Sequence, residues 1–354
     1  MFIRHPLNPL LEPHQITPSQ PDWQVIGVFN PGAIRFGDET LLLVRIAERP
    51  RPSSDRWIAC PYVNSHGEVA LQHVDRDDPD WDTHDPRIIR HRTTKSVFLT
   101  SLSHLRLARS RDGAQFTVEP NPWLFPHGPL ESFGVEDARI TQLGDEYVIN
   151  YSAVSPHGIA TALAVTRDFQ HLERRGIAFP PSNRDVTLFP AQIEGRYVAY
   201  HRPMPGEFGR YSMWMATSPD LLSWGEHRLL LEGEGGWEAG RVGGGAPPLW
   251  TPEGWLVIYH AADAQQRYCL GALLVDHDHP DRILGRTQLP VLAPEATYET
   301  EGFFGNVVFT CGAVLQDGMI RLYYGAADER IALAEARVED LLESLLRRDT
   351  HRYR

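Results

Sequence analysis

The stretch EYVINYSAV (146–154), followed by IATALAVTRDFQHL (159–172), decides the fold of this chain. It reads as a strand rich in apolar and aromatic residues, a gap, a second strand and a short acidic turn. The same unit recurs along the sequence. The other copies are SVFLTSL (96–102) with HLRLARSRDGAQF (104–116), RYVAYHRP (196–203) with YSMWMATSPDLLSW (211–224), WLVIYHAA (255–262) with YCLGALLVDHDHP (268–280), and MIRLYYGAAD (319–328) with IALAEARVEDLL (331–342). A further strand, TLLLVRIAE (40–48), precedes them and is a candidate to pair with a neighbour.

Five such units predict an all-β fold, a five-bladed β-propeller. Repeats of roughly fifty residues with several strands each suit a propeller, because one blade cannot bury both of its faces and needs neighbours to cover them. In three units a Ser or Thr is followed two residues later by Asp, a spacing typical of a side-chain-capped turn. These pairs are Ser110 and Asp112, Thr166 and Asp168, and Ser218 and Asp220. A β-sandwich with hairpins is the alternative.

No linker divides the chain, so we expect residues 1–354 to form a single propeller domain. Residues 1–29 are expected to be a loose N-terminal arm, and residues 49–95 a long excursion between strands. Leucines recur at helical spacing near the C-terminus, which predicts a helical segment over residues 338–347.

The composition argues against several classes of protein. The net charge of −12 over 354 residues disfavours a nucleic-acid binder, whose surface is usually basic. Cys60, Cys269 and Cys311 lie far apart without CxxC spacing, so neither a zinc site nor a disulfide framework is indicated. No apolar run has the length of a signal-peptide core or a membrane-spanning helix. We therefore expect a cytoplasmic protein without a metal site that binds neither nucleic acid nor membrane.

The motif GVEDARI (134–140) places two carboxylates beside a guanidinium, directly ahead of the stretch quoted first. Such neighbours can divide their roles, with one acid held protonated and the other ionised. The alternative is a solvated turn with a surface ion pair. In a propeller, polar residues in or just before the first strand of each unit meet at a central funnel, so we expect one pocket. Its expected members are Arg45, Glu136, Asp137, Arg139, Arg184, Asp185, His201, Arg202, Arg241, His260 and Asp328.

Common catalytic motifs are missing from the sequence. HExxH, GxSxG and a GxGxxG within a βαβ unit do not occur, which disfavours zinc proteases, serine hydrolases and dinucleotide-binding enzymes. Trp237, Trp255, Phe303 and Phe304 lie near the polar residues in sequence, and they suit either stacking on sugar rings or packing between blades.

Seven motifs in a fixed order give the chain a family resemblance that spans most of its length. They are FNPGAI (29–34), GVEDARI (134–140), NRDVTLFP (183–190), YHRP (200–203), RVGGGAPPLWTPEGWLVIYH (241–260), GFFGNVVFTCG (302–312) and YYGAAD (323–328). This set resembles glycoside hydrolase family 130, the inverting β-mannoside phosphorylases and β-mannosidases. The family's five-bladed propeller agrees with the number of repeats.

The resemblance implies a role for several residues. The aspartate of the family's GxEDPR motif, the general acid, falls on Asp137, and it is thought to protonate the glycosidic oxygen through a sugar hydroxyl. Arg45, Arg241 and His260 match the positions that hold phosphate. Asp328 matches an aspartate that holds the mannosyl unit. His201 with Arg202 matches a further pocket motif, and Glu136, Arg139, Arg184 and Asp185 are expected to bind substrate or to orient the acid.

The chain departs from the family pattern in places. Ala138 replaces the usual proline of EDPR, and Arg241 stands where lysine is usual and keeps the positive charge. Ala191 and Gln192 replace a common Glu–Lys pair, and SPHGIAT (155–161) lacks an arginine that some members supply to phosphate.

These observations lead to three hypotheses about function. The first is an inverting phosphorylase that cleaves a β-mannoside or oligosaccharide with inorganic phosphate as co-substrate and without a cofactor, giving mannose 1-phosphate and a shortened acceptor. The second is an inverting β-mannosidase, which needs a carboxylate to activate water, and Glu238 is the nearest candidate base. The third is a non-catalytic carbohydrate-binding propeller. The sequence leaves open whether the chain forms a homo-oligomer.

Overall fold

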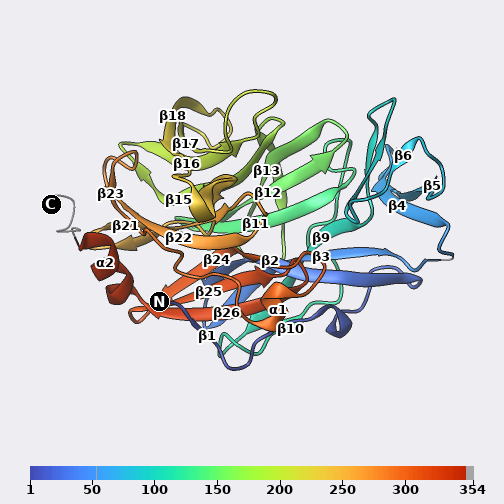
Figure 1. Cartoon of the computed structure of the whole chain (residues 1–354). Helices are drawn as coiled ribbons and strands as arrows, with labels where there is room; N and C mark the ends of the chain where they lie inside the picture. Colours follow the sequence, from blue (N-terminus) through green and yellow to red (C-terminus); the bar gives the residue numbers. More distant parts are fainter. Residues whose placement is uncertain (53, 348–354) are drawn as a thin grey trace.

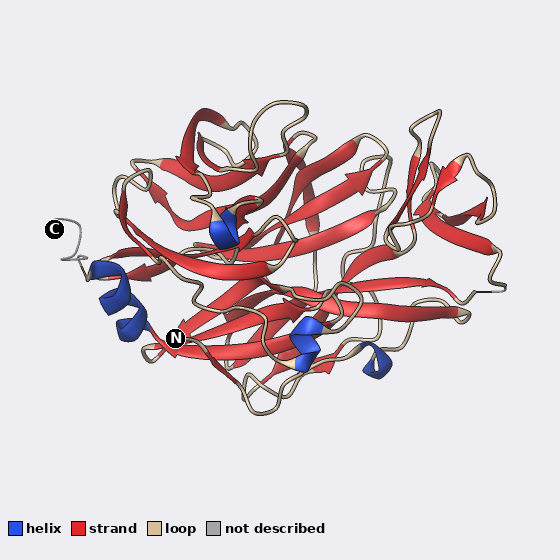
Figure 2. Ribbon diagram, viewed as in Figure 1, coloured by secondary structure: helices blue, strands red, loops and turns tan. Residues whose placement is uncertain are grey.

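The computed structural model describes residues 1–52 and 54–347, and nearly all of its regular structure is β-strand (Figure 2). The helices it contains are short: the 3₁₀ turns η1 (Pro13–Gln15) and η2 (Gly236–Glu238), and the α-helices α1 (Thr297–Thr300) and α2 (Val338–Leu346). Helix α2 confirms the predicted C-terminal helical segment. Within the described residues, no helix has the length and apolar character needed to cross a bilayer.

The strands of the main body form four sheets, and the eight-stranded one divides into two antiparallel units that a single parallel pairing, Gly134 with Ser103, joins. This division gives five antiparallel units (Figure 1). The first unit holds β2 (Trp23–Phe36), β3 (Glu39–Pro50), β9 (Leu102–Ser110) and β10 (Thr117–Val118). The second holds β11 (Gly134–Leu143), β12 (Glu146–Ser155), β13 (Gly158–Thr166) and β14 (Glu173–Phe179). The third holds β15 (Asn183–Ile193), β16 (Arg196–Pro203), β17 (Met213–Ser218) and β18 (Gly225–Leu231). The fourth holds β19 (Arg241–Gly244), β20 (Leu249–Thr251), β21 (Gly254–Ala262), β22 (Tyr268–Val275) and β23 (Ile283–Arg286), and the fifth holds β24 (Val308–Gln316), β25 (Met319–Ala326), β26 (Arg330–Arg337) and β1 (Ile3–Arg4).

Hydrophobic cores lie between successive units, including the last and the first. Apolar side chains of the first and second units pack together, as do those of the second and third, and of the third and fourth. A further core joins the fourth unit to the fifth and includes Leu341 and Leu345 of α2. The fifth core packs Val28 and Val44 of the first unit against Leu333 of the fifth. Each unit therefore buries both of its faces against neighbours, which is what a half-apolar sheet requires.

The predicted acidic turns are present in all three units that carry the pattern. The carboxylates of Asp112, Asp168 and Asp220 each accept main-chain N–H groups two and three residues further along the chain. These hydrogen bonds hold the pKa of the Asp112 and Asp220 carboxyls at about 2. A turn of this kind closes the link between the third and fourth strands of a unit without help from other elements.

One predicted pairing is wrong. SVFLTSL (96–102) was expected to be the first strand of the unit that contains HLRLARS, but β9 pairs instead with β3, which contains TLLLVRIAE, the strand that was a candidate to pair with a neighbour. Leu43 lies opposite Leu107 in this pair. The strand β8 (Val97–Leu99) joins a small separate sheet with β6 (Trp81–Asp82) and β7 (Ile88–His91). The two strands of this unit are separated by more than fifty residues, so the usual preference for a partner that is adjacent in sequence gave the wrong one.

The expected arm and the expected excursion both contain regular structure. Residues 1–29 include β1, which pairs with β26, and the beginning of β2. Residues 49–95 contain β4 (Trp57–Val63) and β5 (Val69–Asp75), which pair with each other, and the small sheet of β6 and β7. In Figure 1, β4, β5 and β6 form a lobe beside the five units. This lobe matters for function because one of its residues reaches the central pocket.

The contact between the fifth and first units gives a test of the packing. A Cβ atom at Gly312 of β24 would overlap the main chain of Pro31 and Ala33 in β2. We expect Gly312→Ala to lower the free energy of unfolding by about 1–3 kcal/mol, the usual cost of overpacking. Gly225→Ala is the matched control, because a Cβ there meets no atom within 4 Å. Denaturant titration of both variants measures the difference, and equal losses would contradict this packing.

Candidate active site

A polar pocket of about 250 Å³ lies where the inner strands of the units meet. Its lining is almost entirely polar or aromatic, and it comes from all five units. The lining residues are Asn30, Arg45, Arg87, Asp137, Arg184, Asp185, Arg202, Met204, Tyr211, Arg241, His260, Gln266, Tyr268, Phe304, Val307, Phe309 and Asp328. Residues far apart in the sequence are therefore gathered at one place, as the repeat pattern predicted.

Bulges in three inner strands present polar side chains to this pocket. The pairing register shifts after Phe29 in β2, after Glu136 in β11 and after Arg184 in β15. Within the three irregular segments, Asn30, Asp137 and Asp185 have φ angles of 48°, 51° and 55°. Asn and Asp tolerate this left-handed conformation better than other residues with a side chain. A bulge re-aims a side chain, and the same device is thus used in three units.

Asp137 is held by neighbours on two other strands. Its Oδ1 accepts hydrogen bonds from the Asn30 amide at 2.9 Å and from Nη1 of Arg45 at 3.0 Å. Nη2 of the same arginine donates to Oε1 of Glu136 at 2.8 Å. Burial acts to raise the pKa of Asp137, but the charge of Arg45 and the bond from Asn30 outweigh it and leave the pKa below its ordinary value. The carboxyl is therefore ionised in the free pocket.

Asp185 is the centre of a second cluster. Its Oδ2 accepts hydrogen bonds from Nε and Nη2 of Arg202 at 2.8 and 2.6 Å, and it lies 3.2 Å from Nε2 of His260. Burial opposes ionisation, yet the charge of Arg202, with a smaller contribution from Arg139, holds the pKa of Asp185 well below its ordinary value. Burial also lowers the pKa of His260, so this imidazole is neutral near pH 7. Among the described residues, Nη1 of Arg202 and Nε of Arg241 have no hydrogen-bond partner. These buried donors suit an anionic ligand.

Asp328 lies near the same cations but differs in its protonation. Burial, together with the negative charges of Asp137 and Glu136, outweighs the attraction of Arg45 and Arg87 and raises the pKa of Asp328 to about 6. The pocket therefore contains two carboxyls with a lowered pKa, Asp137 and Asp185, and one with a raised pKa, Asp328. Such a separation is typical of acid–base sites.

Eight of the eleven residues expected in the pocket line it, and three lie behind it. Glu136 is 4 % exposed and is bound to Arg45. Arg139 donates to the main-chain oxygens of Asp137, Gly244 and Gly245, so it supports the lining rather than facing the ligand. His201 lies against Phe179 and close to the side chains of Asn183 and His227, and burial lowers its pKa to about 3. These arrangements do not place the three side chains as direct substrate ligands.

Glu238, the candidate base for hydrolysis, does not line this pocket. Its carboxylate accepts hydrogen bonds from the hydroxyl of Tyr259 and from the guanidinium of Arg286. It belongs to a neighbouring cavity that shares only Tyr211 and Arg241 with the central pocket. Each oxygen of the Glu238 carboxylate therefore already has a hydrogen-bond partner within the protein.

Several lining residues were not predicted from the sequence. Asn30 is part of the motif FNPGAI, and its position before Pro–Gly in a strand is a signal for a bulge. Arg87 lies in the turn directly before β7, beside the units, and its guanidinium lies 4.2 Å from the ring centre of Phe304. Tyr211 lies within 5.5 Å of the guanidinium carbons of both Arg202 and Arg241. No local pattern marks these last two residues, because tertiary packing alone brings them to the site.

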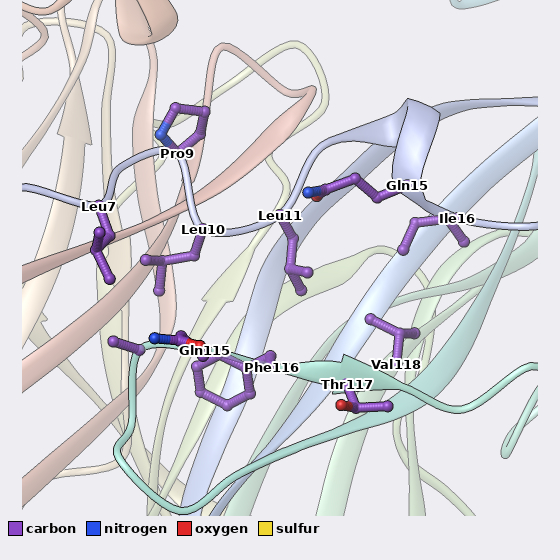
Figure 3. A pocket seen from close by; sticks show the side chains of 11 residues that line it. Leu7, Pro9, Leu10, Leu11, Gln15, Ile16, Gln115, Phe116, Thr117 and Val118 are labelled. Carbon is purple, nitrogen blue, oxygen red and sulfur yellow. The ribbon is translucent and has the colours of Figure 1, made fainter.

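Other parts of the described structure show less chemistry. No group of three or more His, Cys, Asp or Glu residues in the described ranges has metal-binding geometry. A separate pocket of about 570 Å³ lies between the N-terminal segment and β10 (Figure 3). Its lining residues, among them Leu10, Leu11 and Phe116, carry no ionisable side chain. The central pocket is therefore the candidate active site.

The chain belongs to glycoside hydrolase family 130. The family model, described as beta-1,4-mannooligosaccharide phosphorylase, matches residues 86–347. A beta-1,2-mannobiose phosphorylase of Listeria innocua is 44% identical over 348 residues, which cover 97% of this chain and 98% of that protein. A 1,2-beta-oligomannan phosphorylase of a Thermoanaerobacter species is 36% identical over 244 residues, which cover 68% of this chain and 80% of that protein.

A solved structure gives the same result. The Listeria innocua beta-1,2-mannobiose phosphorylase in complex with beta-1,2-mannobiose superposes with a TM-score of 0.94 and covers 97% of this chain and 99% of that one. The resemblance read from the ordered motifs is thereby confirmed at the level of the family.

The raised pKa of Asp328 predicts a stability effect. The folded protein binds this proton more tightly than the unfolded chain, so Asp328 lowers stability as the pH rises from 3.8 through about 6. The wild type loses this stability as the pH rises, whereas Asp328→Asn has no such carboxyl to titrate. We therefore expect the unfolding free energy of the variant minus that of wild type to increase by on the order of 2 kcal/mol across that range and then to level off. Denaturant titration from pH 4 to pH 8 measures this. The exposed Asp145→Asn is the control, and parallel curves for D328N and wild type would contradict the assignment.

Proposed function

We propose that the protein is an inverting phosphorylase that cleaves β-1,2-mannobiose with inorganic phosphate, giving α-mannose 1-phosphate and mannose. The observation that carries this proposal is the charge of the pocket. Its lining contains five arginines against three aspartates, and three of these arginines, Arg184, Arg202 and Arg241, each have a buried nitrogen without a hydrogen-bond partner among the described residues. Such an excess of positive charge suits a phosphate dianion. The linkage follows the relatives from Listeria innocua and Thermoanaerobacter.

The residues then divide the reaction between them. An oxyanion of hydrogen phosphate, held by Arg45, Arg241 and His260, attacks the anomeric carbon on the face opposite the glycosidic bond. That C–O bond breaks, and the leaving oxygen takes the proton that Asp137 releases. The hydrogen phosphate proton, now on the mannosyl phosphate, returns to Asp137 and balances the reaction. Asp328 holds the mannosyl unit, and Arg184, Asp185 and Arg202 complete the polar wall.

The candidate base for hydrolysis, Glu238, lies outside this pocket. An inverting hydrolase needs a second carboxylate to activate water, and Glu238 is bound to Tyr259 and Arg286 outside the pocket. The sequence departures at Ala191 and Gln192 lie away from the lining residues. They therefore leave the phosphate-binding groups intact, and phosphorolysis is the reaction that the site favours.

We also infer that the five units close into a five-bladed propeller. Contacts between units support a ring. Gly134 pairs with Ser103, Tyr211 with Arg241, and Tyr268 with Val307. The core between the fifth and first units completes the circle. Closure explains how inner strands from all five units face one pocket.

Phosphate dependence tests the proposed reaction. β-1,2-Mannobiose incubated with the enzyme should yield mannose 1-phosphate in phosphate buffer, and cleavage should be lost in a phosphate-free buffer. We expect Asp137→Asn to lower kcat by roughly 100- to 10,000-fold, the usual contribution of a general acid.

Glu238→Gln is the control for the hydrolase alternative, because it removes the carboxylate that would activate water with little change in side-chain size. Tyr259 donates to Oε1 and Arg286 to Oε2, so the amide oxygen keeps one of these two hydrogen bonds. We expect this variant to keep phosphorolysis near the wild-type rate. Equal rates with and without phosphate, with mannose as the only product, would point to hydrolysis, especially if E238Q rather than D137N were inactive.

A further inference from the structure

The acid of the proposed reaction is ionised in the free pocket, although a general acid must hold a proton when it acts. The cause is the Arg45 guanidinium, which donates to both Asp137 and Glu136. The Asp137 carboxyl is 8 % exposed, so water screens this ion pair only weakly. Something must offset the charge of Arg45 before Asp137 can take up a proton.

Arg45 has the geometry to respond to phosphate. Its Nε donates to the hydroxyl of Ser103 at 3.0 Å, and one N–H on each terminal nitrogen serves Asp137 or Glu136. A guanidinium has five N–H groups, so two remain for a further acceptor. Because Arg45 lines the pocket, a phosphate that uses these two groups lies beside Asp137. Its negative charge then opposes ionisation of that carboxyl.

We propose that Arg45 determines the choice of phosphate over water: it keeps Asp137 ionised in the empty pocket, and bound phosphate offsets its charge so that Asp137 becomes protonated only when phosphate is in place. This inference rests on the proposed phosphorolysis. In the absence of phosphate, Asp137 stays ionised and cannot donate a proton, because water carries no charge to offset the guanidinium. The glycosidic bond is then not cleaved.

The groups around Asp137 agree with this assignment. Arg45 on β3, Arg139 on β11 and Arg184 on β15 favour the ionised form, and the Asn30 amide on β2 donates to it. Glu136 and Asp328 oppose it. Burial raises the pKa of the Cys311 thiol on β24, so this neighbour is uncharged. Arg139 and Asp185 face each other at 3.6 Å and Arg184 lies 3.9 Å from Glu136, which leaves Arg45 as the cation bonded directly to the Asp137 carboxylate.

Proton uptake on phosphate binding tests the proposal. The enzyme without sugar is titrated with inorganic phosphate in a calorimeter, in two buffers of different ionisation enthalpy at the same pH near 7. We expect wild type to take up about one proton more than Asp137→Asn, because Asn cannot titrate. Any change in the ionisation of phosphate itself is common to both proteins. Equal uptake by the two would overturn the proposal.

Asp328→Asn is the matched control, since Asp328 is the other carboxyl near Arg45 with a shifted pKa. This variant should show the same extra proton as wild type. If the extra proton disappears in D328N and persists in D137N, Asp328 is the group that responds and the role given to Arg45 and Asp137 is wrong.

A kinetic measurement on the wild type gives an independent readout. The pH dependence of kcat/KM for phosphate reports the enzyme without phosphate, whereas that of kcat reports the complex. Loss of activity with rising pH should occur at higher pH in kcat than in kcat/KM. Coincident limbs would refute the proposal while phosphate-dependent cleavage, and with it the proposed function, still stands.

Discussion

The buried guanidinium of Arg139 joins three inner strands of the molecule. It lies on β11, donates to the main-chain oxygens of Gly244 and Gly245, and faces Asp185 of β15 at 3.6 Å. A third hydrogen bond goes to the carbonyl of Asp137. A buried charge without such partners costs several kcal/mol, so the strands that carry the proposed acid and the proposed phosphate-binding groups are held at a fixed spacing.

Compensation of buried charge explains most of the site. Arg45 pairs with Glu136 and Asp137, and Arg202 pairs with Asp185. In both cases a carboxylate offsets the desolvation cost of the buried guanidinium. Nε of Arg184, Nη1 of Arg202 and Nε of Arg241 have no hydrogen-bond partner within the part of the chain that the structure describes, and they are available to an anion. The same charges that stabilise the pocket therefore suit the proposed phosphate, and they also set the protonation of the proposed acid, Asp137.

The repeat of strands and acidic turns could be predicted from the sequence because each depends on residues close together. The apolar alternation of β12 and β13, and the capped turn at Asp168, are local. The partner of β9 could not be predicted, because the strands β4 to β8 separate β3 from β9 along the sequence. In the site, bulge residues such as Asp137 sit in recognisable motifs, whereas Arg87 and Tyr211 reach the pocket from segments without a motif.

The sequence by itself determined the β-rich class, the short C-terminal helix, the family and most of the polar residues of the pocket. Those properties follow from local periodicity and from the order of the motifs. Only the tertiary structure decided which residues face the central pocket. Behind the lining of the central pocket lie Glu136, Arg139 and His201, and Glu238 belongs to another cavity. The reason is physical: side-chain direction depends on bulges, burial and charge pairing between strands, and spacing along the chain does not specify these.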